Sequence, residues 1–219
     1  MTATVERGSP MSWWNRGCWS VLLCLVGCAS DSSGPDYTDA QMHRQVIDKE
    51  TGKGISDVLV AFVWTRNEGF SPGGSNTVCT HLALLHTDGE GRYTIPTWRS
   101  YTPGTFVPFK PGYSRVIDPI ARREGRDYLK PFRGTVQERQ SEFERIYNPV
   151  GCTEDEDKKL VELYQRMYEE AKAIASPEKD TKFIDGALVI YEYAALGREE
   201  AQKRSLARRL MRLREGTNK

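Results

Sequence analysis

The stretch Ile55–Thr65, ISDVLVAFVWT, constrains the fold more than any other part of the chain. Successive side chains of a β-strand point to opposite faces. On one face this stretch would place Val58, Val60, Phe62 and Trp64. On the other face it would place Leu59, Ala61 and Val63. Because neither face is polar, the stretch predicts a central strand that is buried on both sides.

The residues around this stretch form short apolar runs that are separated by turn signals. The runs between Met42 and about Asp118 include VCTHLALLH, RYTIP, TFVPFK and YSRVID, with Gly, Pro or Asp at their ends. Strands of this length and spacing are typical of antiparallel sandwiches. We therefore predict an N-terminal antiparallel β-sandwich of about seven strands over residues 42–133.

The segment His86–Pro96, HTDGEGRYTIP, is either a metal-binding loop or the tight turn of a β-hairpin. Asp88 can cap a turn through its side chain, and Gly89 and Gly91 can supply positive φ. A calcium loop needs oxygen ligands at alternate positions and a distal Glu, and this series is lacking. A zinc site would need Cys79, His81 and His86, but strand parity places His86 on the opposite face. The turn is the favoured interpretation, and no metal site is predicted.

The residues of this region resemble a known family. VIDKETGKGISDVLVAFVW, followed by HTDGEGRYTIPTW and FKPGY, is similar to the carboxypeptidase regulatory-like domain. Matches to its motifs are Asp48, Thr51, Gly52, Ile55, Thr87, Asp88, Gly91 and Tyr93. The chain departs from the family at Gly54, where Pro is usual, and at Asp57-Val58, where Gly-Ala is usual. The resemblance implies a transthyretin-like β-sandwich and says almost nothing about function.

From Thr135 the apolar pattern takes a helical period. A first amphipathic stretch ends near Asn148, and a second is expected to begin at a capping box formed by Thr153 and Glu156. Its apolar stripe would contain Leu160, Leu163, Tyr164, Met167, Tyr168, Ala171 and Ile174. A third stretch, Phe183–Leu196, is apolar almost all round and is expected to be the most buried. The fold class is therefore α+β, with a helical C-terminal region over residues 134–219.

The last helical stretch carries leucines on one face and cations elsewhere. Leu206, Leu210 and Leu213 share a face, and residues 198–219 hold eight Lys or Arg and three Glu. Docking of the leucines on the protein is the favoured interpretation. The alternative is contact of this basic helix with anionic head groups of a membrane.

The N-terminus resembles the signal of a bacterial lipoprotein. Arg16 precedes an apolar run that is too short to span a bilayer. The run ends in Leu25-Val26-Gly27-Cys28, which resembles a lipobox. The alternative is an uncleaved anchor, and Met11 can be the true start. We predict a signal peptide over residues 1–27, lipid on Cys28, and a flexible tether over residues 28–41. Ala29 after the cysteine favours the outer membrane, facing the periplasm.

Cysteine usage then predicts a disulfide. Cys18 and Cys24 would leave with the signal and Cys28 would carry lipid, so that Cys79 and Cys152 remain. An even pair in an oxidising compartment favours a bond between the two. The alternative is two buried thiols, since a free cysteine packs like a small apolar residue.

No motif of the sequence identifies a reaction. G-x-S-x-G, H-E-x-x-H and P-loop patterns are absent, and so are the zinc ligands of a carboxypeptidase. The net charge of +1 argues against a nucleic-acid binder. Trp98, Tyr101 and Tyr113 can form a shelf for a sugar or peptide, although core packing is favoured.

We expect a non-catalytic envelope lipoprotein that acts as a binding or assembly module, with no cofactor. Its expected partners are the membrane, through the N-terminal lipid, and an unidentified envelope protein or glycan. A carbohydrate-binding lipoprotein is the alternative, and an enzyme of unrecognised type is the third class.

Overall fold

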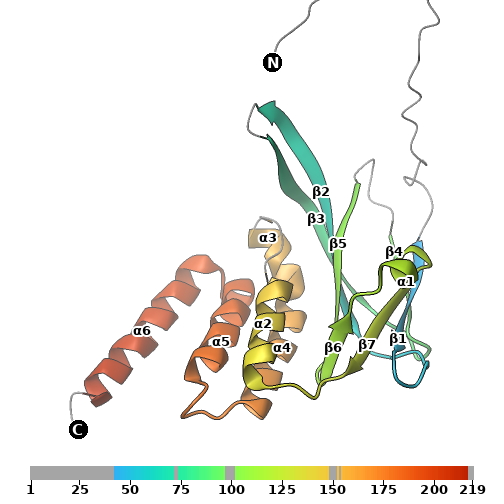
Figure 1. Cartoon of the computed structure of the whole chain (residues 1–219). Coiled ribbons are helices and arrows are strands. Elements are labelled where there is room, and N and C mark those ends of the chain that lie inside the picture. Colours follow the sequence, from blue (N-terminus) through green and yellow to red (C-terminus); the bar gives the residue numbers. More distant parts are fainter. Residues whose placement is uncertain (1–41, 72–73, 97–101, 148–151, 153, 217–219) are drawn as a thin grey trace, which may run out of the picture. The chain divides into compact units, whose positions relative to one another are not determined.

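The computed structural model describes residues 42–71, 74–96, 102–147, 152 and 154–216, which all belong to one compact unit, Tyr37–Lys219. Its class is mixed α+β, as predicted (Figure 1). One sheet has the strand order β4-β1-β7-β6, formed by Arg92–Ile95, Met42–Asp48, Arg126–Pro131 and Tyr113–Val116. The other has the order β3-β2-β5, formed by Gly74–His86, Leu59–Ser71 and Thr102–Phe109.

A short helix interrupts the strands, and the remaining helices follow them. Helix α1, Pro119–Arg123, lies between β6 and β7. The C-terminal half contains α2 (Val136–Tyr147), α3 (Glu154–Asp157), the 3₁₀ turn η1 (Lys158–Leu160), α4 (Val161–Ile174), α5 (Thr181–Leu196) and α6 (Arg198–Gly216).

Strand β2 is the central strand that its sequence predicts. One of its faces, with Val60, Phe62 and Trp64, packs in a cluster with buried residues of β1, β4 and β7. The opposite face, with Leu59, Ala61 and Val63, packs in a second cluster with buried residues of the helices. The β3-β2-β5 sheet therefore lies between the other sheet and the helical half.

One strand pair differs from the predicted antiparallel pattern. β1 and β7 are parallel, with Gln45 opposite Arg126 and Asp48 opposite Leu129, whereas the other strand pairs of both sheets are antiparallel. The chain passes through the second sheet between β1 and β7, so no tight turn fixes their relative direction. The apolar runs of a sequence indicate where strands lie, but they do not indicate that two of these strands pair in parallel.

The motif residues hold the turns of the two-sheet region. Asp48 Oδ1 accepts hydrogen bonds from the backbone N–H groups of Glu50 and Thr51, at 2.8 and 3.2 Å. The Thr87 hydroxyl donates to the carbonyl of Ile55 at 2.7 Å and accepts from the N–H of Val58 at 2.9 Å. These side chains supply hydrogen-bond partners to backbone groups at the ends of the strands, where no neighbouring strand supplies them.

The segment His86–Pro96 contains a turn, as favoured, but β3 and β4 on its two sides belong to different sheets, so the expected β-hairpin is wrong. Asp88 Oδ1 accepts from the N–H groups of Glu90 and Arg92, both at 2.8 Å. Gly91 has φ 78°, whereas Gly89 is not in the left-handed region, so the expectation for Gly89 is wrong. One left-handed residue is enough because the Asp88 side chain closes the rest of the turn. After the turn, Tyr93 is buried in the core.

Helix α2 begins at a capping box that the sequence reading missed. The Glu138 carboxylate accepts from the N–H of Thr135 at 2.6 Å, and the Thr135 hydroxyl accepts from the N–H of Glu138 at 3.3 Å. Phe143 and Ile146 are buried against the central sheet and the other helices, as expected for an amphipathic helix.

The second helical stretch is less continuous than predicted. It is divided into α3, η1 and α4. The expected cap residue Thr153 lies outside the described residues. The Glu156 carboxylate accepts instead from the backbone N–H of Leu82 in β3, at 2.8 Å. This contact directs the first turn toward the sheet, and the apolar stripe then continues with Leu163, Tyr164 and Met167 buried in α4.

Helix α5 lies between α4 and α6, yet only four of its 16 residues are buried. It is not the most buried helix, contrary to expectation, because it is covered only by its helical neighbours. Helix α6 docks on α5 through Ala201 and through Arg208, whose guanidinium donates to both oxygens of Glu192 at 2.6 and 2.7 Å. Its leucines face solvent, so the favoured docking of the leucines is wrong.

The predicted signal peptide (1–27), the tether (28–41) and Cys28 lie outside the described residues. Among the described helices, none combines the length and apolarity that a membrane span requires.

Candidate ligand-binding site

A hollow of about 540 Å³ opens between the first sheet and helix α2. Its walls come from the edge strand β6, the end of β7 with the loop that follows, and one side of α2. The β1–β2 turn adds one residue. The lining residues are Glu50, Ser114, Arg115, Ile117, Lys130, Pro131, Phe132, Arg133, Gly134, Glu138, Glu142, Arg145 and Ile146.

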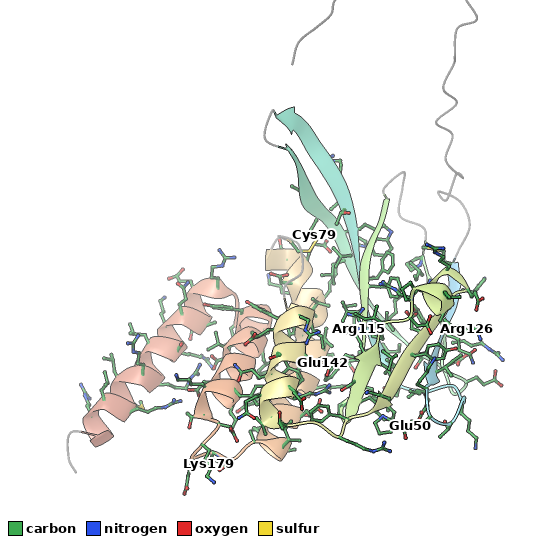
Figure 2. All side chains as sticks on the ribbon, in the orientation of Figure 1. Glu50, Cys79, Arg115, Arg126, Glu142 and Lys179 are labelled. Atoms are coloured by element: carbon green, nitrogen blue, oxygen red, sulfur yellow. A yellow bond between two sulfur atoms is a disulfide. The ribbon has the colours of Figure 1, made fainter. Side chains whose placement is uncertain are left out.

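Glu142 of α2 forms the inner part of this wall. One of its oxygens accepts from the backbone N–H of Arg115 at 2.8 Å. The other accepts from the hydroxyl of Ser114 at 3.1 Å and from Nη1 of Arg139 at 2.8 Å. Figure 2 labels Arg115 and Glu142 on these facing elements. The carboxylate is thus occupied by protein donors and joins α2 to the edge of the sheet.

Arg139, a buried residue of α2, fixes the position of this wall from the interior of the protein. Its side chain is 0% exposed and donates from Nε and Nη2 to the two oxygens of Glu170 in α4, at 3.0 and 2.6 Å. Its Nη1 also donates to the carbonyl of Tyr113 at 2.6 Å. These acceptors offset the cost of removing the charged guanidinium from water. It fixes α2 relative to β6 and α4, and therefore fixes the shape of the hollow.

The other two carboxylates of the lining are occupied as well. Glu138 accepts from the N–H and hydroxyl of Thr135, and these hydrogen bonds, the N–H first, lower the pKa of Glu138 below its usual value. Glu50 pairs with both terminal nitrogens of Arg133 at 2.7 and 2.8 Å. Both carboxylates are therefore engaged by groups of the protein itself.

Three cations of the lining lack such partners. Arg115, Lys130 and Arg145 make no ion pair with a carboxylate anywhere in the described part of the chain. Arg145 donates from Nε to the carbonyl of Ser141, within its own helix, at 3.2 Å. The hollow thus presents positive charge that the protein has not neutralised locally.

Arg115 is the cation with the most perturbed environment. Burial lowers the pKa of its guanidinium below the usual value, and the charges of Arg122 and Arg145 act in the same direction. Asp127 and Glu142 oppose the shift without reversing it. A bound anion would supply the compensation that this partly desolvated cation lacks.

The arrangement is suited to holding a carboxylate or phosphate group. A guanidinium binds such groups in a bidentate manner, and a Lys and a second Arg nearby add charge. The residues that line the hollow include neither His nor Cys, and the Ser114 hydroxyl already donates to Glu142. The lining therefore offers binding groups rather than an activated nucleophile.

The predicted aromatic shelf is described only in part. Trp98 and Tyr101 lie outside the described residues. Tyr113 is half-buried, packs against the cluster between the two sheets and accepts from Arg139 through its carbonyl. For Tyr113 this is the packing role that the sequence favoured.

The residues considered for zinc have other partners. Cys79 is bonded to Cys152, His81 lies 3.4 Å from a carboxylate oxygen of Glu156, and His86 lies 3.2 Å from one of Glu162. The described residues contain no cluster of three His, Cys, Asp or Glu that could hold a metal ion.

The disulfide between Cys79 and Cys152 is confirmed. The two Cα atoms lie 4.8 Å apart, and the bond joins β3 to the residue that shortly precedes α3. It therefore attaches the helical half covalently to the central sheet, as expected from the sequence.

The sequence reading missed the three cations of the hollow. Arg115 lies on a short strand, Lys130 near the end of another and Arg145 in the last turn of α2, where cations are usually solvated. The one signal in the sequence is the T-x-x-E pattern at Thr135–Glu138, which marks the start of α2 and therefore of the wall that this helix forms.

Comparison of the chain with protein-family models, with curated proteins and with solved structures finds no match.

Proposed function

We propose that the protein is a non-catalytic, lipid-anchored component of the cell envelope whose hollow beside Arg115 binds an anionic group of a partner. The observation that carries this proposal is a set of three cations, Arg115, Lys130 and Arg145, that make no ion pair with the described residues and lie in a hollow whose carboxylates are all engaged. The most suitable ligand class is a carboxylate or phosphate that belongs to an envelope protein or an acidic glycan.

The proposed location is the outer membrane, facing the periplasm. It is supported by the lipobox-like sequence at Cys28 and by the Cys79–Cys152 disulfide, which suits an oxidising compartment. The proposed membrane contact is the lipid on Cys28.

The proposed scaffold is a β-sandwich of the carboxypeptidase regulatory-like type. Its support is that the motif residues Asp48, Thr87, Asp88 and Gly91 all occupy turns, where such motifs have a structural role. On this proposal the sandwich supplies the frame, and the partner is recognised where α2 meets the edge of the first sheet.

Thermal unfolding of the compact unit Tyr37–Lys219, followed with phosphate, citrate or glucose at constant ionic strength, tests the anion site. The two anions should stabilise the wild type, by about 1.4 kcal/mol at about ten times Kd, and glucose should not. Arg115→Gln should abolish the effect. Arg126→Gln is the matched control, because this exposed arginine pairs with Glu124 outside the hollow (Figure 2).

Equal stabilisation of the wild type and Arg115→Gln by both anions would disprove the site. A glycan array then addresses the carbohydrate alternative. Binding of acidic glycans that depends on Arg115 would make a glycan the partner, whereas binding of neutral glycans that is independent of Arg115 would favour the aromatic shelf.

A further inference from the structure

Helix α6 exposes an apolar face. Leu206, Leu210 and Leu213 are 58%, 50% and 59% exposed. At about 100° per residue, these three side chains share one side of the helix. The helix docks on α5 through the opposite side, where Ala201 is fully buried and Arg208 pairs with Glu192. The leucines therefore do not hold the helix on the protein.

Cations lie on both sides of this apolar face. The segment from Lys203 to Arg214 contains six Lys or Arg and no acidic residue. Helical geometry places Arg209 on one flank of the leucines, and Lys203 and Arg214 on the other. All three side chains are exposed, and Arg209 makes no ion pair in the described part of the chain. Lys203 pairs with Glu199 at 2.7 Å, so Arg209 is the flanking cation most available to a partner. A surface that complements this face is apolar at its centre and negatively charged at its margins.

A second copy of the chain fits this face poorly. The 4-3 spacing of the leucines matches a coiled-coil seam, but it extends over fewer than two heptads. In either helix orientation, the residues that flank the seam would bring Arg209 or Arg214 of one copy beside an arginine of the other. Like charges at these positions oppose pairing.

We propose that α6 lies on the surface of a bilayer that contains anionic lipids, with its leucines in the interface and its flanking cations at the head groups. A narrow apolar face between cations on a single surface helix is the pattern of an interfacial helix. The proposal uses the lipid on Cys28 only to bring the chain to a membrane, and its test omits that lipid.

Sedimentation with vesicles tests the contact, using the compact unit Tyr37–Lys219 without the acylated segment. The vesicles contain either phosphatidylcholine alone or 30% phosphatidylglycerol in phosphatidylcholine. The wild type should bind only the anionic vesicles, and binding should weaken as NaCl rises from 0.05 to 0.5 M. Replacing Leu206, Leu210 and Leu213 with Ser should weaken binding by about tenfold or more.

The matched control is Ile120→Ser with Ile174→Ser, because these two residues are 70% and 38% exposed and lie outside both α6 and the hollow. The control should bind as the wild type does. All the replaced side chains are exposed, and unchanged thermal midpoints would show that folding is intact.

The proposal would be overturned by no binding to anionic vesicles, by equal binding of the triple-serine variant, or by leucine-dependent dimerisation in the absence of vesicle binding. Retention on immobilised polyglutamate without vesicle binding would also overturn it, in favour of an acidic protein partner. None of these results bears on Cys28, whose acylation is measured separately.

Discussion

Single polar side chains determine how the chain passes between its two sheets. The Thr87 hydroxyl both donates to Ile55 and accepts from Val58, so one oxygen satisfies the backbone at two places. Its hydrogen bonds are inaccessible to water, where an unpaired donor would cost about 1–3 kcal/mol. Asp88 has a related role in the next turn, where its hydrogen bonds to backbone N–H groups of Arg92 and Glu90 lower its pKa.

Gly91 is a residue where both the backbone conformation and the close packing oppose a side chain. Its φ is 78°, and an added Cβ would lie 2.4 Å from the carbonyl oxygen of Val46 and 2.6 Å from the nitrogen of Ile55. Gly91→Ala should lower the free energy of unfolding by more than about 2 kcal/mol, measured by urea denaturation. Gly89→Ala is the control, since nothing lies within 4 Å of its added Cβ, and it should change stability by less than about 0.5 kcal/mol. Similar effects of both substitutions would contradict this account.

At the scale of elements, the sequence predicts a structural feature well when the residues of that element alone determine it. β2 could be predicted as a central strand because both of its faces are apolar in its own sequence. The parallel direction of β7 could not, since it depends on a connection through another sheet. The exposure of the α6 leucines could not be predicted, because apolar residues usually dock, whereas this helix docks through Ala201 and through ion pairs with α5.

The disulfide joins two elements that the chain separates by 73 residues. Closing a loop of this length stabilises the folded state by at most about 4–4.5 kcal/mol in the chain-entropy model, which is often an overestimate. Replacing Cys79 and Cys152 together with Ala should therefore lower the free energy of unfolding by about 2–4 kcal/mol. Urea denaturation measures the loss.

Reduction of the wild type should reproduce this loss, and the double variant should not respond to the reductant. Thiol titration of the denatured, unreduced unit should find no free thiol. Two titratable thiols, or a wild type that is unaffected by reduction, would contradict the bond.

At the scale of the whole molecule, the candidate site depends on which charges the fold leaves without partners. The sequence contains almost equal numbers of basic and acidic residues, 31 and 30, so composition conceals any local excess. The hollow becomes positive only because Glu142 faces Arg139 and Glu50 faces Arg133. Glu50 and Arg133 are 83 residues apart, and Glu142 also accepts from Ser114 and Arg115, which are 28 and 27 residues away. One sequence read alone does not contain such distant pairings. The approximate division into a strand region and a helical region, in contrast, could be predicted from periodicity.

The proposed functions all require that the chain is held at a membrane, and Cys28 is the residue that would hold it. A single acyl chain anchors a protein only marginally, whereas several chains on one cysteine anchor it stably. In cells that export the full chain, a fatty-acid probe should label the wild type and leave Cys28→Ser unlabelled. Cys24→Ser is the control, because Cys24 lies in the same apolar run but outside the Leu25-Val26-Gly27-Cys28 motif, and it should be labelled like the wild type. Equal labelling of Cys28→Ser would show that the lipid is on another residue, and an unlabelled wild type would show that it is absent. In the second case the contact of α6 with a bilayer would lose the anchor that brings it there.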